Sequence, residues 1–74
     1  MDKNLNLEKR FGCKLSYIRK EKKLSQMKLA EIAGLNYNYI GQIERAEANV
    51  TIKTIKILAN ALDVEVKDFF EFNF

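Results

Sequence analysis

The chain of 74 residues contains no histidine, proline or tryptophan, and a single cysteine, Cys13. One cysteine cannot form an internal disulfide, and without histidine the chain offers neither a Cys–His or Ser–His nucleophile nor a plausible zinc cluster. No run approaches the roughly 18 apolar residues that a membrane span requires. These absences argue against an enzyme, a metal protein and a membrane protein, and no cofactor or small-molecule ligand is expected.

The composition that remains, with 47% apolar and 31% charged residues, is ordinary for a globular protein. The length allows one domain, residues 1–74, whose core is small enough that a partner subunit would help to stabilise it. The N-terminal stretch MDKNLNLEKR lacks the apolar segment of a signal peptide. A cytoplasmic location is therefore expected.

Positive charge is concentrated in the first part of the chain. Residues 1–28 carry nine basic and three acidic side chains, whereas residues 29–74 carry four basic and seven acidic ones. This asymmetry favours an anionic partner, although a cluster such as residues 19–23 is also typical of a solvated helix end. Charge supports a nucleic-acid partner without establishing one.

The spacing of apolar residues is helical almost throughout and predicts an all-α fold. Five helices are expected, at about 7–22, 26–33, 37–45, 52–62 and 65–70. Ser25, Asn36 and Thr51 are the expected N-caps of the second, third and fourth helices. The buried stripe of the fourth helix is expected to consist of Ile52, Ile55, Leu58, Ala59 and Leu62.

Residues 26–45 have the spacing of a helix-turn-helix. Ala30 is small where the two helices must cross closely, and Gly34 lies where the turn requires a positive φ. Ile40 and Ile43 are three residues apart and share one face of the second helix. In such a unit the second helix enters the major groove of DNA.

The face of that helix opposite the two isoleucines is polar and is the candidate for reading base pairs. Asn38 and Gln42 carry amides that pair with adenine, and Tyr37 adds a hydroxyl and a ring for a thymine methyl. The predicted DNA site therefore contains A·T pairs. The alternative is that these side chains form only the solvated face of a surface helix.

Phosphate contacts need donors at the edges of that face. Ser25 and Gln26 lie at the N-terminus of the second helix, where free amides and the helix dipole favour a phosphate. Capping is the alternative role of these residues, and both roles are compatible. Further candidates are Asn36, Tyr39, Arg45, Asn49 and Thr51.

The segments FGCKLSYIRKEKKLSQMKLAEIAG, LNYNYIGQIER and NVTIKTIKILANALDV resemble the Cro/repressor-type helix-turn-helix family, also called the xenobiotic-response-element type. The resemblance implies a compact, lambda-repressor-like domain of five helices that binds operator DNA, usually as a dimer. It also implies an ion pair between Arg19 and Glu44, partly buried and structural. Within the family, the controller proteins of restriction–modification systems are the most similar subgroup.

Some positions depart from the family pattern. Lys23 and Ala46 stand where glycine is common, and Val50 replaces a frequent proline. Lys23 is therefore expected to adopt a positive φ. Glu47 places a negative charge where many relatives carry basic residues, which predicts weaker or differently arranged phosphate binding by this loop.

Apolar residues near the C-terminus predict a dimer surface within residues 57–74. The expected interface residues are Ile57, Ala61, Phe69, Phe72 and Phe74. At least one of Phe69 and Phe70 is expected to close the base of the core instead, and an alternative is that the alternating Phe70, Phe72 and Phe74 form a short edge strand.

The leading hypothesis is a homodimeric transcriptional regulator that binds an inverted-repeat operator in double-stranded DNA, as a repressor or an activator. An antitoxin with the same fold is the closest alternative. A third hypothesis is an interaction module that docks through its C-terminal aromatic residues and does not bind DNA.

Overall fold

The computed structural model describes residues 6–71, which form α-helices and one 3₁₀ helix. The α-helices are α1 (Leu7–Glu21), α2 (Gln26–Ala33), α3 (Tyr37–Glu44) and α4 (Ile52–Leu62), and the 3₁₀ helix is η1 (Val66–Phe70). The all-α prediction and the bounds of α2 and α4 are confirmed, while α1 and α3 each end one residue earlier than expected. No helix in the described part of the chain is long and apolar enough to cross a membrane.

The prediction of a fifth α-helix is wrong, because the last element is a 3₁₀ helix. The amide of Asp68 donates to the Glu65 carbonyl three residues earlier, at 3.0 Å, which is the 3₁₀ pattern. The Asp68 carboxylate accepts in return from the Glu65 amide at 2.9 Å. A segment of five residues gains few α-helical bonds, so these local contacts and the burial of Phe69 decide its shape.

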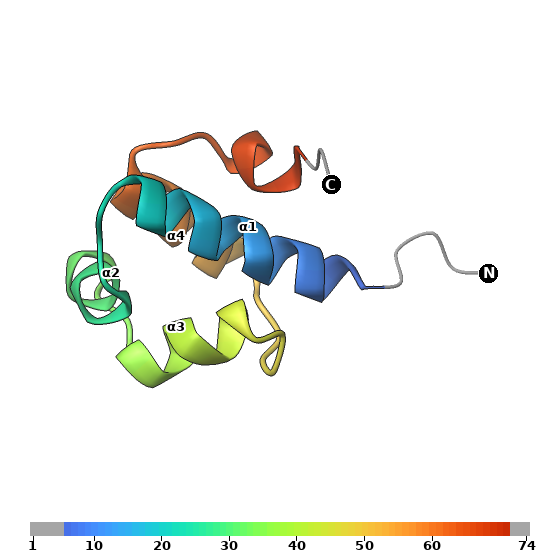
Figure 1. The fold of residues 1–74 in the computed structure, drawn as a ribbon, viewed down its shortest axis with the longest axis horizontal. Coiled ribbons are helices and arrows are strands. Elements are labelled where there is room, and N and C mark those ends of the chain that lie inside the picture. The colour runs from blue at the N-terminus through green and yellow to red at the C-terminus, as the bar shows by residue number, and fades with distance from the viewer. Residues whose placement is uncertain (1–5, 72–74) are drawn as a thin grey trace.

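Helix α1 lies in the centre of the molecule, with α3 along one side and η1 along the other (Figure 1). Helix α2 connects the end of α1 to α3 and packs against α3 and α4. The core between these helices is made of Phe11, Leu15, Ile18, Leu29, Ala30, Ile40, Ile43, Leu58, Ala59, Leu62 and Phe69. Full burial of a larger apolar side chain stabilises the fold by about 1.5–3 kcal/mol.

The three predicted N-caps are confirmed. Ser25 Oγ accepts from the amide of Lys28, Asn36 Oδ1 from that of Asn38, and Thr51 Oγ1 from that of Thr54. Each cap satisfies a helix amide that has no partner within its own helix. These side chains therefore set where α2, α3 and α4 begin.

The expected left-handed turns are also present. Gly34 has a φ of 69°, and Lys23 has a φ of 61°. Ala46 adopts the same conformation, with a φ of 61°, as does Asp63 at the end of α4. A Cβ atom makes this conformation costly, so Lys23 and Ala46 are strained where glycine would not be.

Two expectations for the C-terminal half are wrong. Ile52 is 86% exposed, because it is the first residue of α4 and lies outside the core. Phe69 is fully buried, with its ring edge against Phe11 at a centroid distance of 5.3 Å, so it is not available to a dimer surface. Phe70, where the alternative edge strand would begin, is the last residue of η1, whereas Phe72 and Phe74 lie outside the described residues.

A candidate nucleic-acid interface

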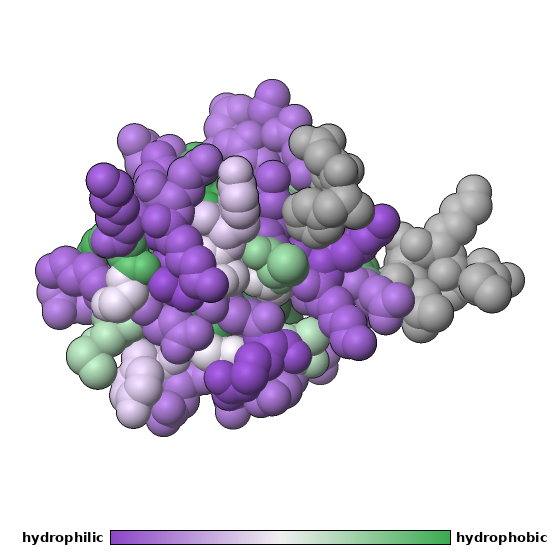
Figure 2. Space-filling view, viewed as in Figure 1, coloured by the Kyte–Doolittle hydropathy of each residue, from purple (hydrophilic) through white to green (hydrophobic). Residues whose placement is uncertain are grey.

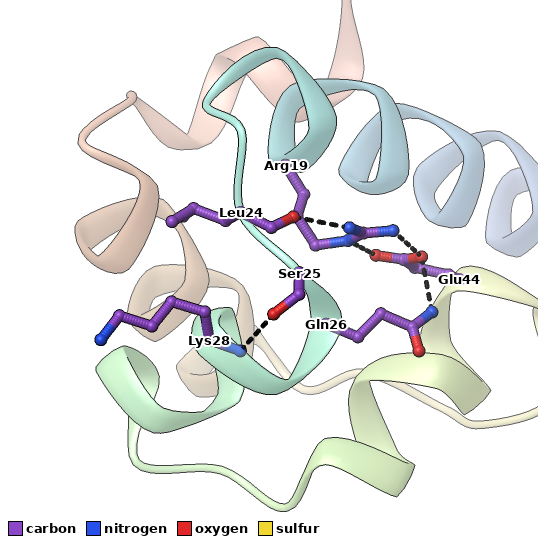
Figure 3. A network of polar contacts seen from close by, with 6 residues as sticks. All are labelled: Arg19, Leu24, Ser25, Gln26, Lys28 and Glu44. Carbon is purple, nitrogen blue, oxygen red and sulfur yellow. Dashed lines mark hydrogen bonds and ion pairs between the residues drawn. The ribbon is translucent and has the colours of Figure 1, made fainter.

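A polar network joins α1, α2 and α3 behind the helix-turn-helix (Figure 3). Arg19 Nε and Nη2 donate to the two carboxylate oxygens of Glu44 at 2.6 and 3.0 Å, and Nη1 donates to the Leu24 carbonyl at 2.7 Å. Gln26 Nε2 donates to the same carboxylate at 3.0 Å. The Arg19–Glu44 pair implied by the family resemblance is thus confirmed and joins the end of α1 to the end of α3, while Gln26 joins the first turn of α2 to the same carboxylate.

This pair is largely removed from solvent, with side-chain exposures of 9% for Arg19 and 7% for Glu44. Desolvation acts to raise the pKa of Glu44, but the hydrogen bonds from Arg19 and Gln26 outweigh it, so the pKa lies below its usual value. The carboxylate is therefore ionised at neutral pH and holds the guanidinium in place. This geometry is that of a structural pair rather than of a DNA-binding group.

Gly12 allows α1 to approach the end of α3, and sequence reasoning missed this role. A Cβ atom on Gly12 would lie 2.8 Å from the carbonyl oxygen of Glu44 and closer still to that of Ile43. Both obstacles are backbone atoms, which cannot rotate away. A glycine one residue after a core phenylalanine, Phe11, was the only signal in the sequence.

The predicted apolar side of α3 is confirmed by the burial of its two isoleucines. Ile40 and Ile43 are 0% and 1% exposed, whereas Tyr37, Asn38 and Gln42 are exposed to solvent. We call these three exposed residues the reading face. Figure 2 shows mainly hydrophilic side chains on the face of the molecule that includes α3, with small and separate apolar areas.

Several candidate phosphate ligands also have structural bonds. Ser25, Asn36 and Thr51 are N-caps, and the Gln26 amide nitrogen is bound to Glu44. Tyr39 is partly buried, and its hydroxyl donates to the carbonyl of Asn49 at 3.0 Å, which holds the α3–α4 loop against the helix.

Arg45 is the C-cap of α3, and its side chain is more than half exposed and forms an ion pair with Glu47. Asn49 is exposed on the following loop. Together with the N-terminus of α2, these groups lie on elements that flank the reading face. The structure therefore combines an exposed polar helix with candidate donors at its edges.

A model of the helix-turn-helix family matches residues 15–69, and the chain belongs to this family. Control protein C.SmaI of Serratia marcescens is 58% identical over 43 residues, which are 58% of this chain. These residues are 51% of C.SmaI, so the chain spans about half the length of that relative.

Solved structures of restriction–modification controller proteins have the same fold. C.AhdI from Aeromonas hydrophila superposes with a TM-score of 0.84 at 41% identity, over 85% of this chain and 96% of that one. A C.Esp1396I tetramer in complex with its natural 35 base-pair operator gives a TM-score of 0.81 at 35% identity, over 88% and 86% of the two chains.

Proposed function

We propose that the protein is a homodimeric regulator that binds an inverted-repeat operator and controls a restriction–modification system, without catalysis and without a cofactor. The single observation that carries this proposal is the reading face of α3, held outward by two buried isoleucines and by the Arg19–Glu44 pair. The similarity to C.AhdI and to the operator-bound C.Esp1396I supports it.

In this proposal Asn38 and Gln42 read adenines through bidentate amide contacts, and Tyr37 contacts a neighbouring thymine. The seven candidate phosphate ligands position the protein on the backbone without carrying sequence information. Gln26 acts through its backbone amide and the N-terminal dipole of α2, because its side-chain nitrogen is already bound to Glu44.

Dimerisation through α4 and η1 is part of the proposal, but on a different surface from the one expected from the sequence. Ile57 and Ala61 are half-buried, and they lie on the side of α4 opposite Ile52. A groove between α4 and η1 is instead lined by Ile52, Ile55, Lys56, Ala59, Asn60, Val64, Glu65, Val66 and Phe70.

We infer that a second copy of the chain occupies this groove. Ile52, Val66 and Phe70 are exposed apolar side chains around it, and Lys56 and Glu65 line it with opposite charges. In a two-fold interface Lys56 of each copy can face the acidic residue of the other, which makes the groove complementary to itself in charge. Sedimentation tests this surface, and Ile52→Asp is expected to be monomeric. If Ile52→Asp remained dimeric and Ile57→Asp became monomeric, the groove would be rejected and the interface expected from the sequence, around Ile57, would be supported.

Selection of bound duplexes from a random pool tests the function itself. An enriched inverted repeat with A·T pairs, and with half-site centres about 34–36 Å or one DNA turn apart, is expected. Failure to enrich any sequence would contradict the proposal. A neighbouring gene for a methyltransferase or endonuclease would support the assignment to a restriction–modification system, and a toxin gene in its place would contradict that part.

A further inference from the structure

The ion pair between Arg45 and Glu47 lies beside the reading face. Arg45 Nε is 3.1 Å from Glu47 Oε1, and both side chains are more than half exposed. The guanidinium lies over Gly41: a Cβ atom placed on Gly41 would be only 2.9 Å from Arg45 Nη1. Gly41 follows Asn38 by one helical turn, so the paired guanidinium extends along the face of α3 that is proposed to meet DNA.

The backbone holds Glu47 in this position. Ala46, with its φ of 61°, turns the chain back immediately after α3. The amide of Ala46 then donates to the Ile43 carbonyl at 3.0 Å, and the amide of Glu47 donates to the Gln42 carbonyl at 2.7 Å. These two bonds fix the backbone of Glu47 two residues beyond the C-cap Arg45, so its carboxylate starts within reach of the guanidinium.

A carboxylate and a DNA phosphate present the same chemistry to an arginine, namely anionic oxygens that accept from the guanidinium. We propose that Glu47 is an internal competitor of the DNA phosphate, which must displace it from Arg45 when the protein binds. This proposal depends on the proposed function, because it requires DNA at α3. Since phosphate contacts carry no sequence information, Glu47 weakens binding to specific and random DNA alike.

A double-mutant cycle on DNA affinity tests this role. The full chain and the variants Glu47→Gln, Arg45→Gln and Arg45→Gln/Glu47→Gln are titrated by fluorescence anisotropy at one fixed salt concentration. Each is measured on the duplex selected from the random pool and on a scrambled duplex of the same length and composition. Glu21→Gln, at the exposed end of α1, controls for the change in net charge.

Glu47→Gln should bind both duplexes about two- to fivefold more tightly, which is the range expected for loss of an exposed ion pair. In the Arg45→Gln background the same substitution should produce no more than the change seen for Glu21→Gln. Thermal melts that match the parent protein should accompany both results, because neither side chain is part of the core.

An equal gain in both backgrounds would overturn the proposal, because the carboxylate would then act only through net charge. Weaker binding by Glu47→Gln would also overturn it, since Glu47 would then position Arg45 for DNA instead of competing for it. Absence of any selected sequence would reject the proposed function and this inference together. Selective binding without an Arg45-dependent gain would reject this inference alone.

Discussion

The inner and outer sides of α3 differ in almost every physical respect. The inner side is buried, with Ile40 and Ile43 in the core and Glu44 bound to Arg19, and it lies against Gly12 of α1. The outer side presents Asn38 and Gln42 to solvent. A helix of eight residues thus separates the groups that stabilise the fold from those proposed to recognise DNA, so substitutions on the two sides should have separable effects.

The largest effect is expected on the inner side, for Glu44→Ala. The Arg19 side chain is 9% exposed in the structure, and this variant removes its anionic partner. Breaking a buried pair in this way costs about 3–5 kcal/mol of the free energy of unfolding, out of roughly 4–11 kcal/mol for a domain of this size.

Urea denaturation measures this loss, and Glu47→Ala is the matched control because it breaks an exposed pair. The control should lose at most about 1 kcal/mol. Equal midpoints for Glu44→Ala and the parent protein would show that the inner pair does not stabilise the fold.

Gly12→Ala should be the next most damaging change. Its methyl group would clash with two backbone carbonyls at the end of α3, and overpacking of this kind lowers the free energy of unfolding by about 1–3 kcal/mol. Gly41→Ala is the control within α3, since its methyl group meets only side-chain atoms that can move, Arg45 Nη1 at 2.9 Å and Gln26 Oε1 at 3.5 Å. That control should be neutral or up to about 1 kcal/mol more stable in thermal melts, because alanine is the better helix former. The reverse order would contradict the geometry.

Asn38→Ala and Gln42→Ala test the outer side through binding. Each should weaken binding to the selected duplex by about 1–3 kcal/mol, because each removes a contact to a base edge. Thermal stability should stay within about 0.5 kcal/mol, as expected for exposed positions. An equal loss on scrambled DNA would show that these side chains contact phosphates or nothing specific.

The contribution of the Arg19–Glu44 pair to the free energy of unfolding should depend on pH. The pKa of Glu44 is lowered in the folded protein from its ordinary value of 4.5, so the unfolded chain takes up a proton first as the pH falls. The contribution of the pair is therefore complete above about pH 4.5 and is lost as the pH falls through the lower, folded pKa. Denaturation midpoints from pH 6 to pH 3 should show this loss, and a Glu44→Gln variant with the same slope would contradict it.

The smallest effects are expected at the strained turns. Lys23→Gly and Ala46→Gly relieve a positive φ but add entropy to the unfolded chain, so each should be neutral or stabilising by up to about 1 kcal/mol. Lys22→Gly is the control, because Lys22 has an ordinary φ of −81° and glycine should there cost about 0.5–1 kcal/mol. Thermal melts that show a clear loss for Lys23→Gly would mean that the turn is not strained.

Sequence reasoning succeeded in the helix-turn-helix because its signals are local. Ser25 and Asn36 cap their own helices, Gly34 provides its own positive φ, and the spacing of Ile40 and Ile43 determines which side of one helix is apolar. None of these features depends on where another part of the chain lies. The bounds of α2 were therefore predicted to the residue.

The amino-acid sequence by itself determined the all-α class, the helix-turn-helix and its exposed amides, because caps, turns and helical period act over a few residues. Tertiary structure alone decided that Phe69 packs on Phe11, that Ile52 lies outside the core and that the backbone at the end of α3 packs directly against Gly12. Each of these outcomes depends on an element distant in the chain. Apolarity predicts that a side chain favours burial, but the space left by the other helices determines which side chains are buried.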